Sequence, residues 1–587
     1  MDRRTLLKAA AAGTAATALS GVARSASPTG AMLVRSAGTS SHSYGPTMDK
    51  IIAFATEDLA AAGVPGATLS IVDAEGLVAT KTLGWADMDR RLPVKPSHLF
   101  QIGSISKSFA ALCVYRLAQD GKIDLDAPLS RYLADFPLPS ESISIQQVLS
   151  HTSGMPRSAP MFPRVPDQRL WTGFAPGSKF TYCNTGYELI GMLVEKITGK
   201  RYPDALHELV IKPLRIVGLR EVCQASDRAD YAVGYAPLDS SGPNLSRVRL
   251  GQAPWVNIDT ADGNIGATAE AMAGYLRYLI SLGRGRGAPL FSDALARRFA
   301  TVQGAAAAAD VFGPHSGYAS GLGVIDLDGR PAFHHTGGSW GFAACLTVDA
   351  QTGVGCFVNV NAQVGAYRPN RITQNACRLL RQAREGTPTS IVAHAASSKV
   401  DGGESSVHIE NSERYVGTFV APDGSRFQVV AKSGRLFLNA DGREARLEPF
   451  GKQLFLTDHP RYGSHFLEFE LRDATVATVW FGPVLYGRDT AVPQPSVPAE
   501  LAALQGEYGS PDHFTGWWRT VFAQGDRLVI ENVAFYRVKE TLRRKEDFWY
   551  LESSNDTCER IRFEAEANGI PQRLNYSGRD LWRFNRI

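Results

Sequence analysis

The interpretation of this chain starts from the stretch FQIGSISK at residues 100–107. It contains the pattern S-x-x-K, with Ser104 and Lys107 three residues apart. In a helix this spacing places both side chains on one face. At a helix start the serine also meets the positive end of the helix dipole and free backbone N–H groups. A neighbouring lysine in its uncharged form can accept the serine's proton, so the stretch predicts a nucleophilic serine.

The surrounding pattern mixes strands and helices. After Ser104, apolar residues recur at helical spacing at positions 109, 112, 113 and 117. Residues 67–72 and 77–85 read as strands around a turn, and 187–197 read as a second helix. Strand-like sequence returns at 343–348 and 355–360. These patterns predict an α+β domain whose sheet draws strands from both ends of the domain, with helices between them.

Two further motifs follow along the chain. Tyr182 and Asn184 form a Y-x-N pattern after a turn signal at 175–178. A tyrosine near the serine can pass a proton to a leaving group, and the asparagine can bind a substrate amide. Taken alone, Tyr182 would be interpreted as a buried residue with a satisfied hydroxyl. The third motif is HTGG at 335–338, where small residues at a sheet edge let a substrate backbone approach closely.

In this order the three motifs resemble those of the penicillin-recognising serine hydrolases. That family includes β-lactamases, DD-peptidases, some esterases and D-aminopeptidases. The turns at 149–154 and 174–178 also look like the family's turns. The resemblance covers residues 45–384 and implies a β-lactamase/DD-peptidase-like catalytic domain.

The resemblance also implies roles. Ser104 is the acylated nucleophile, Lys107 accepts its proton, and Tyr182 carries the proton to the leaving group. The predicted substrate-binding residues are Asn184, His335, Gly337 and Gly338. Asn184 would bind the acyl side of the substrate. The backbone N–H groups of Ser104 and Gly338 would form the oxyanion hole.

His335 stands where most β-lactamases of this family carry a lysine. Near pH 7 a histidine is largely neutral, since its ordinary pKa is about 6.5. A carboxylate next to the scissile bond would therefore meet little positive charge. We expect uncharged amides and esters to be preferred over penicillins.

Two other stretches imitate catalytic motifs. The sequence HTSG at 151–154 looks like the third motif but precedes Tyr182, and we interpret it as a structural turn. Residues 337–341 match G-x-S-x-G around Ser339. That nucleophile elbow requires a strand, a tight turn and then a helix. Strand-like sequence follows instead, which makes an α/β-hydrolase the weaker alternative.

The C-terminal part reads as two copies of one unit, at 413–497 and 498–587. Alternating polar and apolar residues and similar internal spacing in both copies predict two antiparallel β-barrel domains. They resemble the barrels appended to D-aminopeptidases, whose loops would border the active site. Barrels acting as independent small-ligand carriers are an open alternative.

The N-terminus resembles an export signal. Residues 1–26 combine Arg3 and Arg4 with a short apolar stretch, which is typical of a twin-arginine signal peptide. A short membrane anchor is the alternative. Residues 27–44 read as a flexible leader and 385–412 as a linker. We expect export to the periplasm by the twin-arginine route and no stable membrane insertion after signal cleavage.

Composition narrows the classes of partner. The net charge is only +4 over 587 residues, and no basic run with interleaved aromatics suggests nucleic-acid binding. Seven cysteines occur singly, without C-x-x-C, and most are expected to be core residues. No metal and no cofactor are expected.

The predicted partner is a small-molecule or peptide substrate, and a non-catalytic penicillin-binding or sensing protein is the alternative function. The substrate could be a D-amino-acid amide or peptide, an ester or a β-lactam.

Overall fold

The computed structural model describes residues 33–35 and 44–584, apart from gaps within that range. The gaps are 77, 141, 161–169, 239–248, 304–311, 313–314, 366, 387–390, 392–407, 452, 473–474, 511–517, 534–536 and 555–557. The predicted signal peptide and most of the predicted leader and linker lie outside the described residues. Three residues of the predicted leader, β1 (Leu33–Arg35), form an edge strand against β3.

A nine-stranded antiparallel sheet forms the centre of the catalytic domain, in the order β1-β3-β2-β14-β13-β12-β11-β10 with β4 beside β3. The chain thus supplies strands from both ends of the domain, as the sequence predicts. The other strands are β2 (Gly66–Asp73), β3 (Val78–Asp87), β4 (Leu92–Pro93), β10 (Gly317–Tyr318), β11 (Gly323–Asp326), β12 (Pro331–Ser339), β13 (Phe342–Asp349) and β14 (Val354–Val360).

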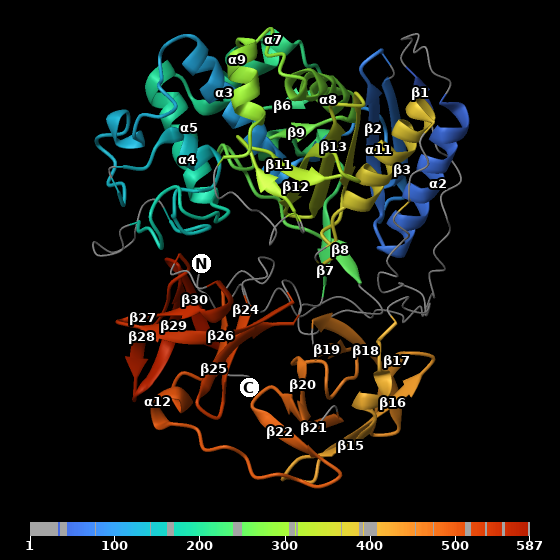
Figure 1. The fold of residues 1–587 in the computed structure, drawn as a ribbon, viewed down its shortest axis with the longest axis vertical. Coiled ribbons are helices and arrows are strands. Elements are labelled where there is room, and N and C mark those ends of the chain that lie inside the picture. Colours follow the sequence, from blue (N-terminus) through green and yellow to red (C-terminus); the bar gives the residue numbers. More distant parts are fainter. Residues whose placement is uncertain are drawn as a thin grey trace, which may run out of the picture.

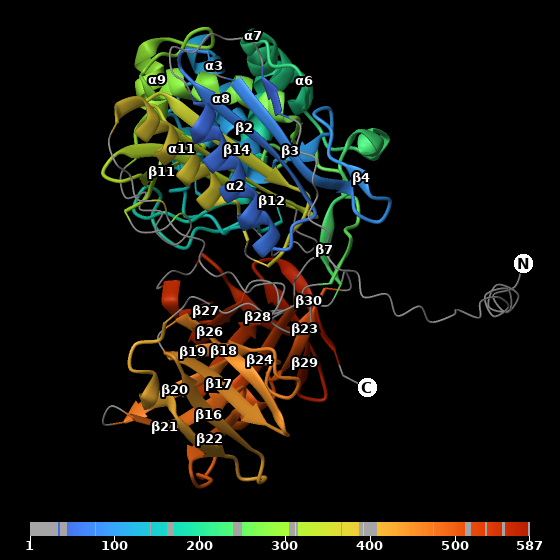
Figure 2. The same ribbon diagram turned by 90° about the vertical axis from the view of Figure 1, so that its right-hand side faces the viewer.

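Helices cover both faces of this sheet (Figures 1 and 2). On one face lies α8 (Ala269–Gly283); on the other lie α2 (Gly45–Ala61) and α11 (Asn370–Glu385). Every residue of β2, β13 and β14 is buried. Because both faces are covered, these strands read as continuous apolar runs rather than as alternating patterns.

The helix after Ser104, α3 (Ser106–Gln119), is the core of the second half of the catalytic domain. Every residue from Ser106 to Tyr115 is buried, so the helix is enclosed and has more than one apolar face. The other elements of this half are α4 (Ile145–Leu149), α5 (Asn184–Thr198), α6 (Tyr202–Leu206), α7 (Lys212–Leu214), α9 (Asp293–Ala300), β5 (Phe100–Gln101), β6 (Leu219–Arg220), β7 (Tyr235–Pro237), β8 (Leu250–Gln252) and β9 (Gly266–Ala267).

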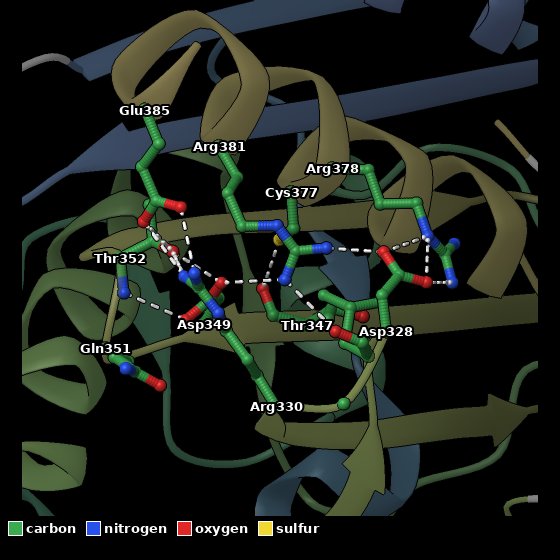
Figure 3. A network of polar contacts seen from close by, with 12 residues as sticks. Asp328, Arg330, Thr347, Asp349, Gln351, Thr352, Cys377, Arg378, Arg381 and Glu385 are labelled. Carbon is green, nitrogen blue, oxygen red and sulfur yellow. Dashed lines mark hydrogen bonds and ion pairs between the residues drawn. The ribbon is translucent and has the colours of Figure 1, made fainter. Parts of the chain in front are cut away.

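A network of arginines and carboxylates fixes the last turns of α11 to the sheet (Figure 3). Arg381, only 4% exposed, contacts Asp328 and lies 3.5 Å from the fully buried carboxylate of Asp349. Arg330 pairs with Glu385 at 2.9 Å. Asp349 also accepts the backbone N–H of Thr352 at 2.9 Å. The network joins the β11–β12 and β13–β14 turns to one helix end.

The C-terminal half forms two closed antiparallel barrels of eight strands each. Barrel 1 contains β15 (Gly417–Val420), β16 (Arg426–Lys432), β17 (Arg435–Ala440), β18 (Arg443–Gly451), β19 (Leu454–Thr457), β20 (Leu467–Arg472), β21 (Thr475–Phe481) and β22 (Val484–Arg488). Barrel 2 follows α12 (Ala499–Ala502) and contains β23 (Gly506–Gly509), β24 (Trp518–Gln524), β25 (Arg527–Asn532), β26 (Val538–Lys545), β27 (Phe548–Leu551), β28 (Ile561–Ala567), β29 (Ile570–Tyr576) and β30 (Arg579–Phe584).

The repeat seen in the sequence corresponds to equivalent strands of the two barrels. Three pairs of similar segments make up the repeat and fall on the first, third and fifth strands of each barrel: 415–419 and 504–508, 434–438 and 525–530, and 454–456 and 548–551. The barrels also contact each other. Lys539 of barrel 2 pairs with Glu468 of barrel 1 at 2.5 Å, and Gln524 donates to the Gly482 carbonyl at 2.9 Å. Both barrels lie on the same side of the catalytic domain (Figures 1 and 2).

None of the helices in the described ranges is both long and apolar enough to cross a bilayer.

Candidate active site

Ser104 and Lys107 meet at the start of α3. Ser104 lies on the 3₁₀ turn Gly103–Ile105 that leads into the helix, and Lys107 lies on its first turn. The Lys107 Nζ atom is 3.2 Å from Ser104 Oγ and donates a hydrogen bond to the Asp262 carbonyl at 2.8 Å. Lys107 is fully buried, whereas Ser104 keeps some exposure. The arrangement gives Ser104 a fixed basic partner and leaves its hydroxyl reachable.

The third motif packs directly against the residues that precede Ser104. A Cβ atom on Gly337 would lie 1.9 Å from the Ile102 carbonyl oxygen, and one on Gly103 would lie 2.7 Å from Gly338 N. Gly103 also has a φ of 54°, which favours glycine. Larger residues at these positions would push β12 away from Ser104. The glycines therefore hold the backbone of Gly338 beside the nucleophile, where the sequence predicts the oxyanion hole.

Tyr182 covers the buried lysine. Its ring centre is 5.2 Å from Lys107 Nζ, and its side chain is 8% exposed. Among the described residues, none hydrogen-bonds to the Tyr182 hydroxyl. Tyr187 provides a second ring, with its centre 5.7 Å from Lys107 Nζ. The structure thus brings Ser104, Lys107 and Tyr182 together, and the roles assigned to them stay predictions.

Asn184 begins α5 next to Tyr182. Its side-chain amide donates to Ser158 Oγ at 3.0 Å, and its backbone N–H donates to the Arg157 carbonyl at 2.6 Å. The Asn184 Oδ1 atom is buried and accepts no hydrogen bond from the described residues. It can accept an N–H from a bound substrate, as its predicted role requires.

His335 lies on β12 with only 1% of its surface exposed. Its Nε2 atom is 3.0 Å from the Tyr318 hydroxyl, and its Nδ1 atom is 2.7 Å from the Thr336 carbonyl. Since a carbonyl only accepts, Nδ1 carries the proton and Nε2 accepts from Tyr318. Burial, with the charge of Lys107 adding to it, lowers the pKa of His335 to about 3. His335 is therefore a neutral residue. Both of its ring nitrogens are engaged inside the protein, so in this arrangement neither is available to hydrogen-bond a substrate.

Neither imitating motif carries a nucleophile in this arrangement. Ser339 ends β12 and is followed by a short turn into β13, so the elbow's strand–turn–helix geometry is absent there. Its hydroxyl donates to the Gln101 side chain. The HTSG stretch follows α4 and is buried.

His151, from that HTSG stretch, nevertheless supports the site. Its Nδ1 accepts the backbone N–H of Cys183 at 3.0 Å, and its ring centre is 4.3 Å from that of Tyr182. Its carbonyl accepts the Thr181 N–H at 2.8 Å. His151 therefore holds the Y-x-N loop in place, a role that the interpretation as a turn missed. The only hint of this role in the sequence is that HTSG precedes the Y-x-N motif along the chain.

Two further groups near Lys107 carried no sequence signal. The first is the Asp262 carbonyl, a backbone atom whose use depends only on the fold. The second is Glu188, one turn into α5, whose pKa is raised to about 7 by burial and by the neighbouring charge of Asp262. Lys107 and Arg579, a residue of barrel 2, partly oppose this shift.

Barrel 2 contacts the segment 154–160, which leads from the HTSG stretch toward the Y-x-N motif. The Cys558 thiol donates to the Gly154 carbonyl at 3.2 Å, and Glu559 Oε1 accepts the Arg157 backbone N–H at 2.8 Å. The Trp171 indole donates to the Cys558 carbonyl at 2.8 Å. A loop of barrel 2 therefore supports the residues next to Tyr182 and Asn184; that such loops border the substrate itself stays a prediction from the resemblance to D-aminopeptidases.

A search of the described residues finds no group of three or more His, Cys, Asp or Glu side chains placed to hold a metal ion.

Comparison with known proteins agrees with this arrangement. A family model described as Beta-lactamase matches residues 51–379. Protein flp of Staphylococcus aureus (strain N315) is 28% identical over 217 residues, 34% of this chain and 43% of that protein. Penicillin-binding protein 4* of Bacillus subtilis (strain 168) is 28% identical over 187 residues, 28% of this chain and 41% of that protein. The matched part of the chain thus spans about two fifths of the length of these curated relatives.

Among solved structures, the octameric penicillin-binding protein homologue from Pyrococcus abyssi is similar in fold, with a TM-score of 0.51 and 22% identity. The match covers 75% of this chain and 99% of that one.

Proposed function

The chain belongs to the beta-lactamase family, and we propose that it is a serine hydrolase that cleaves an amide, peptide or ester bond through an acyl-enzyme on Ser104. The observation that carries this proposal is the contact of Lys107 Nζ with Ser104 Oγ at 3.2 Å, made by a fully buried lysine.

In the first step, Lys107 takes the proton of Ser104 while Ser104 Oγ attacks the substrate carbonyl carbon. The backbone N–H groups of Ser104 and Gly338 bind the oxyanion that forms. Lys107 passes the proton from Ser104 through Tyr182 to the leaving nitrogen or oxygen as the bond of that atom to the carbonyl carbon breaks. In the second step a water molecule attacks the acyl carbon and gives one proton to the same basic groups, which return a proton to Ser104 Oγ as its bond to the acyl carbon breaks.

D-aminopeptidase-like and esterase-like activities fit this site best. The neutral state of His335 removes the fixed cation that would attract a carboxylate beside the scissile bond. The appended barrels also support an enzyme of the D-aminopeptidase kind. We further propose, from the twin-arginine pattern of residues 1–26 alone, that the enzyme is exported, to the periplasm if the cell has one.

The alternative is a penicillin-binding or sensing protein of the same fold that does not turn over. Ser104, Lys107 and Tyr182 in contact favour catalysis, because binding alone does not require all three.

Labelling with an aryl phosphonate tests the proposal. The reagent should attach to Ser104 and release its phenolate, and Ser104→Ala should abolish both labelling and hydrolysis while the circular dichroism spectrum stays unchanged. Lys107→Ala should slow labelling by several orders of magnitude, since serine without a base is a poor nucleophile. Labelling at Ser339 would instead favour the nucleophile-elbow interpretation. Labelling of Ser104 without turnover of amides, esters or a cephalosporin would favour the sensing protein.

A further inference from the structure

The backbone of Arg157 is held from two sides, next to the second motif. Its carbonyl accepts the Asn184 N–H at 2.6 Å, which ties it to the start of α5. Its N–H donates to Glu559 Oε1 at 2.8 Å, which ties it to barrel 2. The second oxygen of Glu559 accepts the Ser577 hydroxyl at 2.6 Å, so this carboxylate is committed to two contacts within the protein. Arg157 therefore has a fixed place beside the site.

The Arg157 side chain is exposed, and its guanidinium lies 5.3 Å from the ring centre of Tyr182. It forms no hydrogen bond or ion pair with any residue that the structure describes. The arginines of the α11 network, by contrast, are paired with carboxylates. A guanidinium offers five N–H donors in a planar fork that matches a carboxylate. Arg157 thus presents unused donors and a positive charge against the tyrosine of the site.

Asn184, whose backbone N–H donates to the Arg157 carbonyl, supplies a second polar group. Its buried Oδ1 accepts nothing from the described residues, so it suits an amide N–H of a ligand. Asn184 thus offers an acceptor for an N–H group, and Arg157, which is hydrogen-bonded to it through the backbone, offers donors for a carboxylate. Together they match an acyl group that carries both an amide N–H and a carboxylate.

We propose that Arg157 binds a carboxylate on the acyl part of the substrate, so that the enzyme favours acidic acyl donors. The inference rests on the proposed acyl-enzyme at Ser104 and adds the substrate class. It concerns the acyl part beside the second motif. The expected poor fit of penicillins concerns a different carboxylate, which lies next to the scissile bond and beside the third motif.

Two aryl phosphonates test this inference without requiring turnover. Their alkyl chains end in a carboxylate or in the matching primary amide, and the rate of Ser104 labelling is measured for each. The wild-type protein should react about tenfold faster with the carboxylate probe, which is the range of one charge-assisted hydrogen bond. Arg157→Gln should bring the ratio of the two rates to about one by slowing the carboxylate probe. Arg157→Lys should restore part of the preference.

Arg131→Gln is the matched control. The Arg131 guanidinium lies 5.7 Å from the Tyr132 ring centre, on the turn Leu129–Arg131, and its loss should leave the ratio unchanged. A ratio near one in the wild-type protein, or an Arg157→Gln variant that slows both probes equally, would overturn the inference while Ser104 labelling still supported the proposed function. Absence of any Ser104 labelling would overturn both.

Discussion

Both ring nitrogens of His335 are engaged inside the protein, by the Tyr318 hydroxyl and the Thr336 carbonyl. With a pKa of about 3, the imidazole gains a proton only when the pH falls toward that value. Above it, the third motif carries no charge at this position. The residue therefore shapes the edge of β12 and adds no charge of its own beside the nucleophile.

This state of His335 gives a kinetic prediction. For a neutral ester, kcat/KM should show no acid limb from His335 between about pH 5 and pH 8, because the imidazole stays neutral throughout that range. His335→Lys should raise kcat/KM for a cephalosporin relative to the ester by about tenfold, since an ammonium group would then face its carboxylate. His335→Gln, which adds no charge, should leave that ratio unchanged. A wild-type enzyme that hydrolyses the cephalosporin faster than any neutral amide or ester would contradict the prediction.

The three motifs of the candidate site could be found in the sequence because each is a short run of neighbouring residues. Arg157 and Glu559 carried no such signal, since they are 402 positions apart and meet only in the folded protein. The internal partners of His335 were also invisible, because Tyr318 lies on a strand of only two residues. The motifs could be predicted from the sequence, but the contacts between segments distant along the chain could not.

At the scale of elements, ion pairs anchor the C-terminal end of α11 to the sheet. Arg381 reaches the carboxylates of Asp328 and Asp349 from the last turns of the helix. Cations near a helix C-terminus also complement its dipole. The network thus fixes the turns on either side of β12 and β13, the strands that carry and support the third motif.

Arg381→Met should destabilise the catalytic domain by about 3 kcal/mol, because it leaves the buried Asp349 carboxylate without its cation. The thermal transition of that domain, followed by calorimetry, measures the loss. Arg543→Met is a suitable control, since Arg543 forms an exposed ion pair with Glu552 in barrel 2 and such pairs contribute little. Equal effects of the two changes would show that burial adds nothing to the α11 network.

Element length explains how well the strands could be predicted. The long strands β2, β3, β13 and β14 match the predicted runs because each spans seven or more residues, enough for a strand pattern to show in the sequence. The short strands β5, β6 and β9 have two residues each and form a sheet only through their partners, so no periodicity could reveal them. In α3, the predicted apolar face was correct but incomplete, because neighbouring elements bury the helix on all sides.

Across the whole molecule, all seven cysteines are free and buried. Burial raises the pKa of six of the thiols, those of Cys113, Cys183, Cys223, Cys345, Cys356 and Cys377, well above the ordinary value. A protonated, buried thiol is a poor nucleophile and a poor partner for disulfide exchange. The fold therefore keeps its thiols unreactive without pairing them.

Titration with a thiol-reactive disulfide checks this. The native protein should react with fewer than one equivalent over minutes, and the protein unfolded in guanidinium chloride should react with seven equivalents. Prior incubation with a mild oxidant should not change the count of seven. Fast reaction of a thiol in the native state would contradict the burial of that cysteine.

The loop of barrel 2 that contacts segment 154–160 has a thermodynamic consequence for the assembled molecule. Glu559 holds the backbone of Arg157, and Cys558 holds Gly154, so barrel docking and the arrangement of the site share contacts. Coupling between two such events is reciprocal: whatever factor docking contributes to the affinity for an acyl group, the bound acyl group returns to docking. A docked barrel 2 that strengthens acyl binding is therefore itself held more tightly, by the same factor, when the site is occupied. Barrel 1 contacts barrel 2 through the ion pair of Glu468 and Lys539, so it takes part in the same coupling.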